Sequence, residues 1–222
     1  MAPLTATFLI CERVSRFFGD VPALREVSFT AERGQLLTLR GPNGAGKSTL
    51  LQILAGALRP TSGTVAVGGS QPGSEAARRH TGFLAHTSLL HPALTVEENL
   101  HFYATLFALP RRRETTARAL ALVRGEALGP RRVDELSQGM RQKAALARCL
   151  LHEPQLLLLD EPFASLDREA VAELRTCLKG LRQAGLCLIL SSHQPEAVAG
   201  LADGALTLER GRLMEAPAVR HG

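Results

Sequence analysis

A glycine-rich loop at residues 41–49 most strongly constrains how this chain of 222 residues can fold. The leucine-rich segment 35–40 runs directly into the loop, and leucine and isoleucine then recur at helical spacing over 50–54. This order predicts a strand, a tight loop and a helix. Glycines let backbone N–H groups turn inward and form a nest for phosphate oxygens, and the following helix adds the positive end of its dipole. The segment therefore predicts a phosphate-binding loop.

The loop matches the spacing Gly-x4-Gly-Lys-Ser between Gly41 and Ser48. In this pattern the lysine reaches the β- and γ-phosphate oxygens and the serine hydroxyl binds Mg²⁺. By chance the bare pattern arises in on the order of one chain in a hundred of this length, and its place between a strand and a helix makes that explanation weaker. We therefore predict a nucleotide site at Gly41, Pro42, Asn43, Gly44, Ala45, Gly46, Lys47, Ser48 and Thr49.

Apolar strand patterns alternate with helical patterns along most of the chain, which indicates a parallel α/β sheet. The expected strands are 7–11, 27–30, 35–40, 64–67, 155–159, 186–190 and 205–208. One expected helix is capped by Thr95, with Glu98 completing a capping box. Three further helices are expected over 113–124, 138–151 and 168–183. No apolar run approaches the ~18–20 residues needed to cross a bilayer. No basic residue precedes the first apolar stretch, so we expect no secretory signal and a soluble chain on the cytoplasmic side.

Two acidic residues follow the strand 155–159, at the end of a parallel strand where ligands bind in open α/β sheets. Asp160 is suited to Mg²⁺ and Glu161 to polarising a water in line with the γ-phosphate. An acidic pair after a strand is more often a helix cap, but a nearby phosphate loop favours the catalytic interpretation. His193 follows the strand 186–190; it is either an ordinary loop histidine or a hydrogen-bond donor to a γ-phosphate oxygen.

Residues 134–140 precede a predicted helix and offer a second anion site at its N-terminus, through the Ser137 hydroxyl and the Gly139 amide. One nucleotide has no obvious need of two such sites. The segment serves as a second site if it faces a nucleotide held by another copy of the chain, and otherwise it is a simple capping loop.

Taken in order, these motifs resemble those of ABC-transporter ATPase subunits, over nearly the whole chain. The resemblance implies a P-loop NTPase with a parallel core sheet, an antiparallel β subdomain and a helical subdomain. It implies a single domain over 1–222, with 1–87 and 152–222 as core and β subdomain and 88–151 as helical subdomain. It further implies ATP and Mg²⁺ as cofactors and ATP hydrolysis coupled to transport.

The resemblance also assigns roles to individual residues. Phe18 matches the aromatic residue that stacks on adenine, although tyrosine is commoner there. Residues 136–140 match the signature motif, with Gln138 and Met140 departing from its commonest form, and His193 matches the switch histidine. Two copies would bind ATP head-to-tail, with Ser137 and Gly139 completing the partner's site. Integral membrane subunits would rest near residues 86–103.

His86 stands where the family usually has a glutamine that binds Mg²⁺. An imidazole suits Mg²⁺ poorly, so metal contact there would be water-mediated or lost. This histidine, together with the short stretches 11–13, 98–103 and 192–195, resembles the ATP-binding subunit of the haem exporter of cytochrome c maturation. The resemblance implies membrane partners of the haem-exporter type and a place on the cytoplasmic face of the bacterial inner membrane.

Composition bears on the alternatives. The net charge is +5, but the arginine runs 111–113 and 131–132 lack interleaved aromatic residues, so we expect no nucleic-acid partner. The histidines at 80, 86, 91 and 101 lack a CxxCH motif, so we expect no direct haem binding. The four cysteines show no metal-ligand spacing and are expected as free thiols. The alternatives are an ABC exporter of drugs or lipids and a soluble ABC ATPase acting on nucleic acid or ribosomes.

Overall fold

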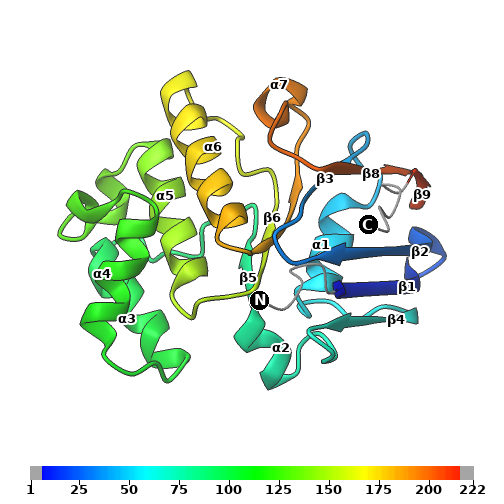
Figure 1. The fold of residues 1–222 in the computed structure, drawn as a ribbon, viewed down its shortest axis with the longest axis horizontal. Coiled ribbons are helices and arrows are strands. Elements are labelled where there is room, and N and C mark those ends of the chain that lie inside the picture. Colours follow the sequence, from blue (N-terminus) through cyan, green and yellow to red (C-terminus); the bar gives the residue numbers. More distant parts are fainter. Residues whose placement is uncertain (1–6, 216–222) are drawn as a thin grey trace.

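The computed structural model describes residues 7–215, which form a three-stranded and a six-stranded sheet with α-helices packed against them (Figure 1). Residues 1–6 are not described, so the expectation that the chain has no secretory signal lies partly outside the described residues. The smaller sheet has the order β2-β1-β4 and is antiparallel. Its strands are β1 (Thr7–Phe18), β2 (Val21–Glu32) and β4 (Ser62–Val67).

The larger sheet has the order β5-β6-β7-β3-β8-β9, and all of its pairs are parallel except the last. Its strands are β5 (Thr81–Leu84), β6 (Leu156–Leu159), β7 (Cys187–Ser191), β3 (Leu36–Arg40), β8 (Gly204–Glu209) and β9 (Arg212–Glu215). The predicted parallel core and antiparallel β subdomain are confirmed. The antiparallel edge strand β9 was not predicted; it follows a tight turn in which Arg210 and Gly211 both have positive φ, at 48° and 79°.

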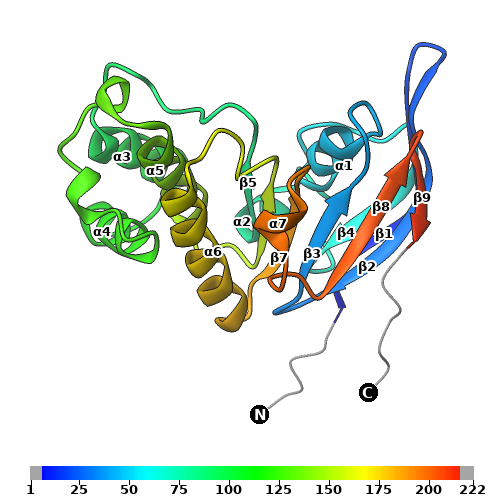
Figure 2. The same cartoon turned by 90° about the horizontal axis from the view of Figure 1, so that it is seen from above.

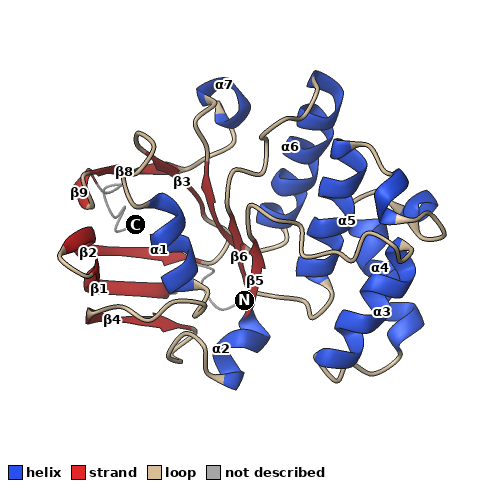
Figure 3. Ribbon diagram, turned by 180° about the vertical axis from the view of Figure 1, so that it is seen from behind, coloured by secondary structure: helices blue, strands red, loops and turns tan. Residues whose placement is uncertain are grey.

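The helices separate into those near the sheets and those that form a group of their own. They are α1 (Lys47–Leu54), α2 (Glu75–His80), α3 (Val96–Leu106), α4 (Arg112–Leu122), α5 (Gln138–Leu150), α6 (Arg168–Gln183) and α7 (Pro195–Val198), with 3₁₀ turns at Glu126–Leu128 and Val133–Glu135. Helices α3, α4 and α5 contact one another on one side of the molecule (Figure 2). Figure 3 shows the same division from behind, with the strands on one half and α3–α6 on the other. Within residues 7–215 no helix has the length and apolarity needed to span a membrane.

The six-stranded sheet is buried on both faces, and each face belongs to a different core. On β6, Leu157 and Leu159 pack with α3–α6, whereas Leu156 and Leu158 pack with α1 and the smaller sheet. All four leucines are fully buried. Alternate side chains of a strand point to opposite faces, so a strand between two cores must be apolar throughout. The continuous leucine run in the sequence has this cause.

Four helices begin at residues that capping chemistry favours, among them α2, which Ser74 caps. Thr95 caps α3 in a capping box with Glu98, Ser137 caps α5, and Asp167 caps α6. Each side-chain oxygen satisfies an N–H group that has no acceptor inside the helix. The starts of α3 and α5 and the full span of α6 agree with the sequence prediction.

Candidate functional site

Residues 41–49 join β3 to α1, and two of their glycines are required by close backbone approach. Gly41 and Gly46 have φ of 141° and 105°. A Cβ atom on Gly41 would lie 2.2 Å from the carbonyl oxygen of Leu208, and one on Gly46 would lie 2.5 Å from that of Ala23. Any other residue would therefore displace β8 or β2 or strain the backbone. The glycines of the motif thus fix the loop against two neighbouring strands.

The start of α1 leaves backbone N–H groups available for an anion. No side chain caps the helix at Gly46, and the N–H groups of a first helical turn have no acceptor within the helix. The buried Lys47 ammonium donates hydrogen bonds from Nζ to the carbonyl oxygens of Gly41 (2.8 Å) and Pro42 (3.1 Å). Within residues 7–215 Lys47 has no acidic partner. The loop therefore carries a positive charge and a helix dipole that no acidic side chain of residues 7–215 offsets, which suits a phosphate.

A buried serine holds both predicted acidic residues at the end of β6. The Ser191 Oγ donates a hydrogen bond to Asp160 Oδ1 (2.7 Å) and accepts one from the Glu161 backbone N–H (2.8 Å). Ser191 is fully buried and Asp160 is nearly so. Leu159 pairs with Leu190 in the parallel register of β6 and β7, which places the next residue of each strand side by side. The serine therefore fixes the Asp160 carboxylate and the backbone from which the Glu161 side chain extends.

Glu161 and His193 form a direct pair. The Glu161 Oε2 lies 2.8 Å from His193 Nδ1 and accepts a second hydrogen bond from the His193 backbone N–H at 3.3 Å. A carboxylate only accepts hydrogen bonds, so Nδ1 carries the proton in this pair. The His193 side chain is more than half exposed, and the Glu161 side chain is 18% exposed. Nε2 of the histidine is thus left for a second contact.

These groups come together because β6, β7 and β3 are parallel neighbours in one sheet. The carboxyl ends of parallel strands lie along the same edge, and ligands of open α/β sheets bind there. The phosphate loop follows β3, Asp160 and Glu161 follow β6, and His193 follows β7. Residues more than a hundred positions apart in the sequence therefore share one edge of the sheet.

Ser137 and Gly139 lie at the start of α5, where each has a role inside this chain. Ser137 Oγ accepts a hydrogen bond from the Met140 N–H at 3.3 Å, which is the capping role. A Cβ atom on Gly139 would lie 2.9 Å from the Cβ of Ala170, so a glycine allows α5 and α6 to approach. Neither residue hydrogen-bonds to the loop 41–49 within residues 7–215. Gln142 connects α5 to the segment that follows β6, because its Nε2 donates a hydrogen bond to the Pro162 carbonyl at 2.9 Å.

Of the three predicted Mg²⁺ ligands, Ser48 and Asp160 are suited to the ion and His86 is not. The Ser48 hydroxyl is exposed, and Asp160 has one carboxylate oxygen engaged by Ser191, which leaves the other available. Hydroxyl and carboxylate oxygens are the ligands that Mg²⁺ prefers. The His86 side chain is exposed and makes no hydrogen bond within residues 7–215, and its nitrogen donors are a poor match for Mg²⁺. No cluster of three or more His, Cys, Asp or Glu side chains suited to a metal occurs in that part of the chain.

Phe18 lies at the end of β1, next to the turn into β2, and is 49% exposed. It therefore has the exposure that a base-stacking residue needs. The structure also shows a neighbour that sequence reasoning did not single out, because the Arg16 guanidinium lies over the Phe18 ring at 4.6 Å from its centroid.

Ser191 is the second residue that sequence reasoning missed. A signal for it was present, since a hydroxyl residue ends the apolar strand 187–190 just as Asp160 ends the strand 156–159. Comparing the residues that follow neighbouring parallel strands would have placed the two side by side.

The cysteines show no reactive character. Cys11, Cys149 and Cys187 are buried free thiols and Cys177 is partly buried. Burial raises the pKa of Cys11 and Cys187 to about 12 and that of Cys177 to about 11. At neutral pH these thiols remain protonated, which agrees with the expected free thiols.

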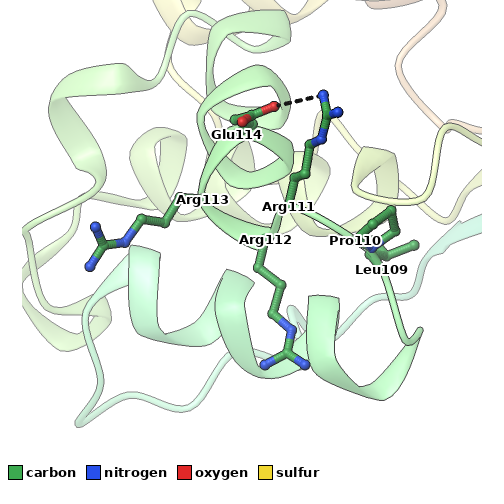
Figure 4. Close-up of a pocket in the computed structure, with 6 residues that line it drawn as sticks. All are labelled: Leu109, Pro110, Arg111, Arg112, Arg113 and Glu114. Carbon is green, nitrogen blue, oxygen red and sulfur yellow. Dashed lines mark ion pairs between the residues drawn. The ribbon is translucent and has the colours of Figure 1, made fainter.

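Three exposed arginines border a separate hollow of about 510 Å³ at the start of α4 (Figure 4). Arg111 faces Glu114 at 3.6 Å, while Arg112 and Arg113 extend away from that pair. The hollow belongs to the helical side of the molecule and contains none of the residues at the sheet edge.

Comparisons with known proteins agree with this geometry. The model of the ABC transporter family matches residues 24–164. The Fe(3+) ions import ATP-binding protein 1 of Rhodococcus jostii is 40% identical over 212 residues, which are 91% of this chain and 60% of that protein. A probable sulfate/thiosulfate import ATP-binding protein of Chlorella vulgaris is 35% identical over 93% of this chain and 89% of its own length.

A dimeric ATP-binding cassette solved with ADP and phosphate, in a post-hydrolysis state, superposes with a TM-score of 0.83 and is 25% identical. The match covers 93% of this chain and 97% of that one. This chain spans about 60% of the length of the Rhodococcus protein.

Proposed function

This chain belongs to the family of ABC transporter ATP-binding proteins, and from that premise we propose that it binds and hydrolyses ATP to drive a transporter. The observation that carries the proposal is the meeting of three features at one sheet edge. They are the phosphate nest at 41–49 with its buried Lys47, the Asp160 carboxylate, and the Glu161–His193 pair. Phosphate binding and activation of water need these groups within reach of one another.

In this mechanism the backbone N–H groups of 41–49 and the Lys47 ammonium bind the β- and γ-phosphates. Lys47 would exchange its two carbonyl contacts for phosphate oxygens, which are stronger acceptors. Ser48 and Asp160 would hold Mg²⁺, which neutralises charge that develops on the phosphates.

Glu161 orients and polarises the attacking water, because it is the carboxylate at the edge that is not engaged by Ser191. His193 holds Glu161 through Nδ1 and reaches toward the γ-phosphate with Nε2.

We propose that two copies bind ATP head-to-tail. Ser137 and Gly139 make no hydrogen bond to the loop 41–49 of their own chain within residues 7–215, yet they mark a helix N-terminus suited to an anion. The dimeric arrangement of the similar cassette supports a second copy as the source of that anion. Each α5 would then complete the site formed by the partner's loop.

Membrane subunits are proposed to bind near residues 86–103, on the cytoplasmic face of the bacterial inner membrane. Leu89 and Phe102 are 54% and 55% exposed there and would supply apolar surface to a protein contact. The names of the relatives, which are import ATP-binding proteins of ABC type, support a transporter partner.

The cargo is a finer question with two candidates. The relatives from Rhodococcus and Chlorella carry import names, for ferric ions and for sulfate or thiosulfate, and these support import of a small nutrient ion as the first candidate. They lend no support to the haem-exporter expectation. Haem handling remains the second candidate on the strength of His86 and the stretches 11–13, 98–103 and 192–195 alone. The nucleotide site itself does not contact cargo in either case.

The chemical proposal is tested with Glu161→Gln. The substitution keeps the shape of the side chain and removes the carboxylate, so we expect ATP affinity to persist while the hydrolysis rate falls about 10²- to 10⁴-fold. Phosphate release and fluorescent-nucleotide binding measure the two effects. Wild-type turnover in the variant would exclude Glu161 from the role proposed for it.

The cargo candidates are separated by affinity purification of the tagged chain from detergent-solubilised membranes, with partners identified by mass spectrometry. A permease with a nutrient-binding protein supports import, and cytochrome c maturation proteins support haem handling. A drug or lipid exporter would keep the mechanism and change the cargo. Recovery of ribosomes or DNA alone would contradict the transport proposal.

A further inference from the structure

The β1–β2 hairpin carries Phe18 close to the phosphate loop. Phe18 pairs with Val21 across the turn, and two residues further along β2 the Ala23 carbonyl lies against Gly46. The two strands reach past the start of α1 in the view from above (Figure 2). At about 3.3 Å per residue, this step places the hairpin end some 6–7 Å beyond Gly46. A base attached to a phosphate held at 41–49 can therefore reach the hairpin.

Arg16 is held in place behind Phe18 by contacts on both sides. Its guanidinium lies 4.6 Å from the Phe18 ring centroid, and its Nη1 donates to the Arg59 carbonyl at 3.1 Å. Its Nε is buried without a hydrogen-bond partner. The backbone beside it is also fixed, because the Phe17 N–H donates to Thr61 Oγ1 and the Thr61 N–H donates to the Ser15 carbonyl.

The orphaned Nε argues against stability as the sole reason for this arrangement. A buried donor without an acceptor costs about 1–3 kcal/mol, which is as much as a cation–π contact at a surface returns. A methionine or leucine would pack against Phe18 without burying an unpaired donor, and would give up only the hydrogen bond from Arg16 Nη1 to the Arg59 carbonyl. The contact between the guanidinium and the ring is therefore better explained by its effect on the position of the Phe18 ring.

We propose that Arg16 is a positioning residue for the nucleotide base and acts through Phe18. It covers one face of the ring, and Phe18 is 49% exposed in total, so the proposal assigns stacking of the base to the opposite face. A fixed ring loses less conformational freedom when a base binds. A cation on one face also draws π-electron density toward itself, which reduces repulsion between the other face and a purine. The inference rests on the proposed nucleotide site.

The test compares a ligand that has a base with one that lacks it. ADP and inorganic pyrophosphate, each with Mg²⁺, are titrated by calorimetry into the wild-type chain and into Arg16→Ala, which avoids hydrolysis during the measurement. We expect Arg16→Ala to weaken ADP about threefold to tenfold and to leave pyrophosphate affinity unchanged. Arg16→Lys, which retains a cation, should recover part of the ADP affinity. Arg16→Met replaces Arg16→Ala if the smaller side chain unfolds the hairpin.

Arg13→Ala is the matched control, since Arg13 lies on the same strand, is exposed and pairs with Glu26. It should change neither affinity. Equal weakening of ADP and pyrophosphate by Arg16→Ala would show a general charge effect and overturn the inference, as would no weakening of ADP. Wild-type ADP affinity no greater than that for pyrophosphate would also overturn it, while leaving the phosphate site intact. Failure of both ligands to bind the wild-type chain would instead overturn the proposed function.

Discussion

Ser191 shows how one hydroxyl group can set the positions of two acidic residues. Its Oγ donates to the buried Asp160 carboxylate and accepts from the Glu161 N–H, so both of its hydrogen bonds within residues 7–215 go to the acidic residues at the end of β6. Ser191 lies on β7, between β6 and β3. It therefore connects the acidic residues to the strand that is paired with β3, which leads into the phosphate loop. The carboxylates are therefore placed before any nucleotide binds.

Ser191→Ala should consequently impair catalysis and stability together. The buried Asp160 carboxylate loses a donor and the Glu161 N–H loses an acceptor, which costs about 1–3 kcal/mol of unfolding free energy. We expect the ATP hydrolysis rate to fall about tenfold, corresponding to 1.4 kcal/mol in the barrier. Urea unfolding and phosphate release measure the two changes. Ser192→Ala is the control, because within residues 7–215 the hydrogen bonds of Ser192 Oγ are with Gln194 alone; equal effects of both variants would contradict the role given to Ser191.

Individual residues were predictable where chemistry demands one residue type at a fixed spacing. Lys47, Asp160 and Glu161 follow from such spacing, and the structure places them at one edge. Arg16 and Ser191 were not predicted, because neither belongs to a motif of fixed spacing. Arg16 lies over Phe18 on the same strand, and Ser191 bonds to Asp160 at the end of the neighbouring strand. His86 was assigned to a metal by resemblance, and its exposed imidazole gives that assignment no support from contacts.

The junction of α3, α5 and β5 contains a partly buried histidine whose charge state is linked to folding. His152 stacks on Phe107 with ring centroids 4.4 Å apart, and its Nε2 lies 3.0 Å from the Thr81 carbonyl. Its Nδ1 is buried without a partner. Burial lowers the pKa of His152 below its ordinary value, with a smaller effect from the nearby positive charge of Arg148.

This histidine predicts a pH dependence of stability with a definite sign. The unfolded chain takes up a proton near the ordinary histidine pKa of about 6.5, whereas the folded chain does so only at lower pH. The stability contributed by neutral His152 is thus complete above about pH 6.5 and is lost as pH falls from there toward the folded-state pKa. We expect the free energy of unfolding to decline between pH 7.5 and 5.5, as measured by urea titration.

His152→Gln should flatten that decline, because glutamine can still donate to the Thr81 carbonyl but does not ionise in this range. His86→Gln changes an exposed histidine and should leave the slope as in the wild type. If the slope survives in His152→Gln, the pH dependence originates elsewhere in the chain.

Elements were predictable in proportion to their periodicity. Helix α6 agrees with the predicted span 168–183 because Asp167 caps it and its apolar positions recur regularly. Strands β1 and β2 are each longer than predicted, since Arg13 and Glu26 adopt positive φ and interrupt the alternation without ending the strands. The six-residue helix α2 was not predicted; it contributes a single buried side chain, Ala77, and so leaves almost no apolar signature.

At the scale of the whole molecule, the proposed head-to-tail arrangement makes a specific prediction for Ser137. In a Glu161→Gln background, ATP should convert the chain to a dimer in light-scattering measurements, and ADP should not. Ser137→Asp keeps a good helix cap but sets a negative charge against the partner's γ-phosphate, so it should abolish the dimer. Ser137→Asn caps equally well without the charge and should preserve it. Dimerisation unaffected by Ser137→Asp would place this residue outside the interface.

Cargo lies beyond what the cassette's own chemistry can specify. Every group at the sheet edge is explained by phosphate, metal or water, which all such ATPases share. The names of the relatives favour import of a nutrient ion, whereas His86 favours haem handling. Neither argument draws on the nucleotide site. Identification of the membrane partner is therefore the experiment that resolves the transport role.

The leucines of β6 alternate between two cores, and this alternation restricts which genetic changes the strand can survive. Exchanging one leucine for another apolar residue alters packing on one face only. Inserting or deleting a single residue would reverse the facing of every side chain beyond it and disturb both cores at once, while also rotating Asp160 away from Ser191. We thus expect descendants of this sequence to exchange one apolar residue for another within the strand and to keep its length.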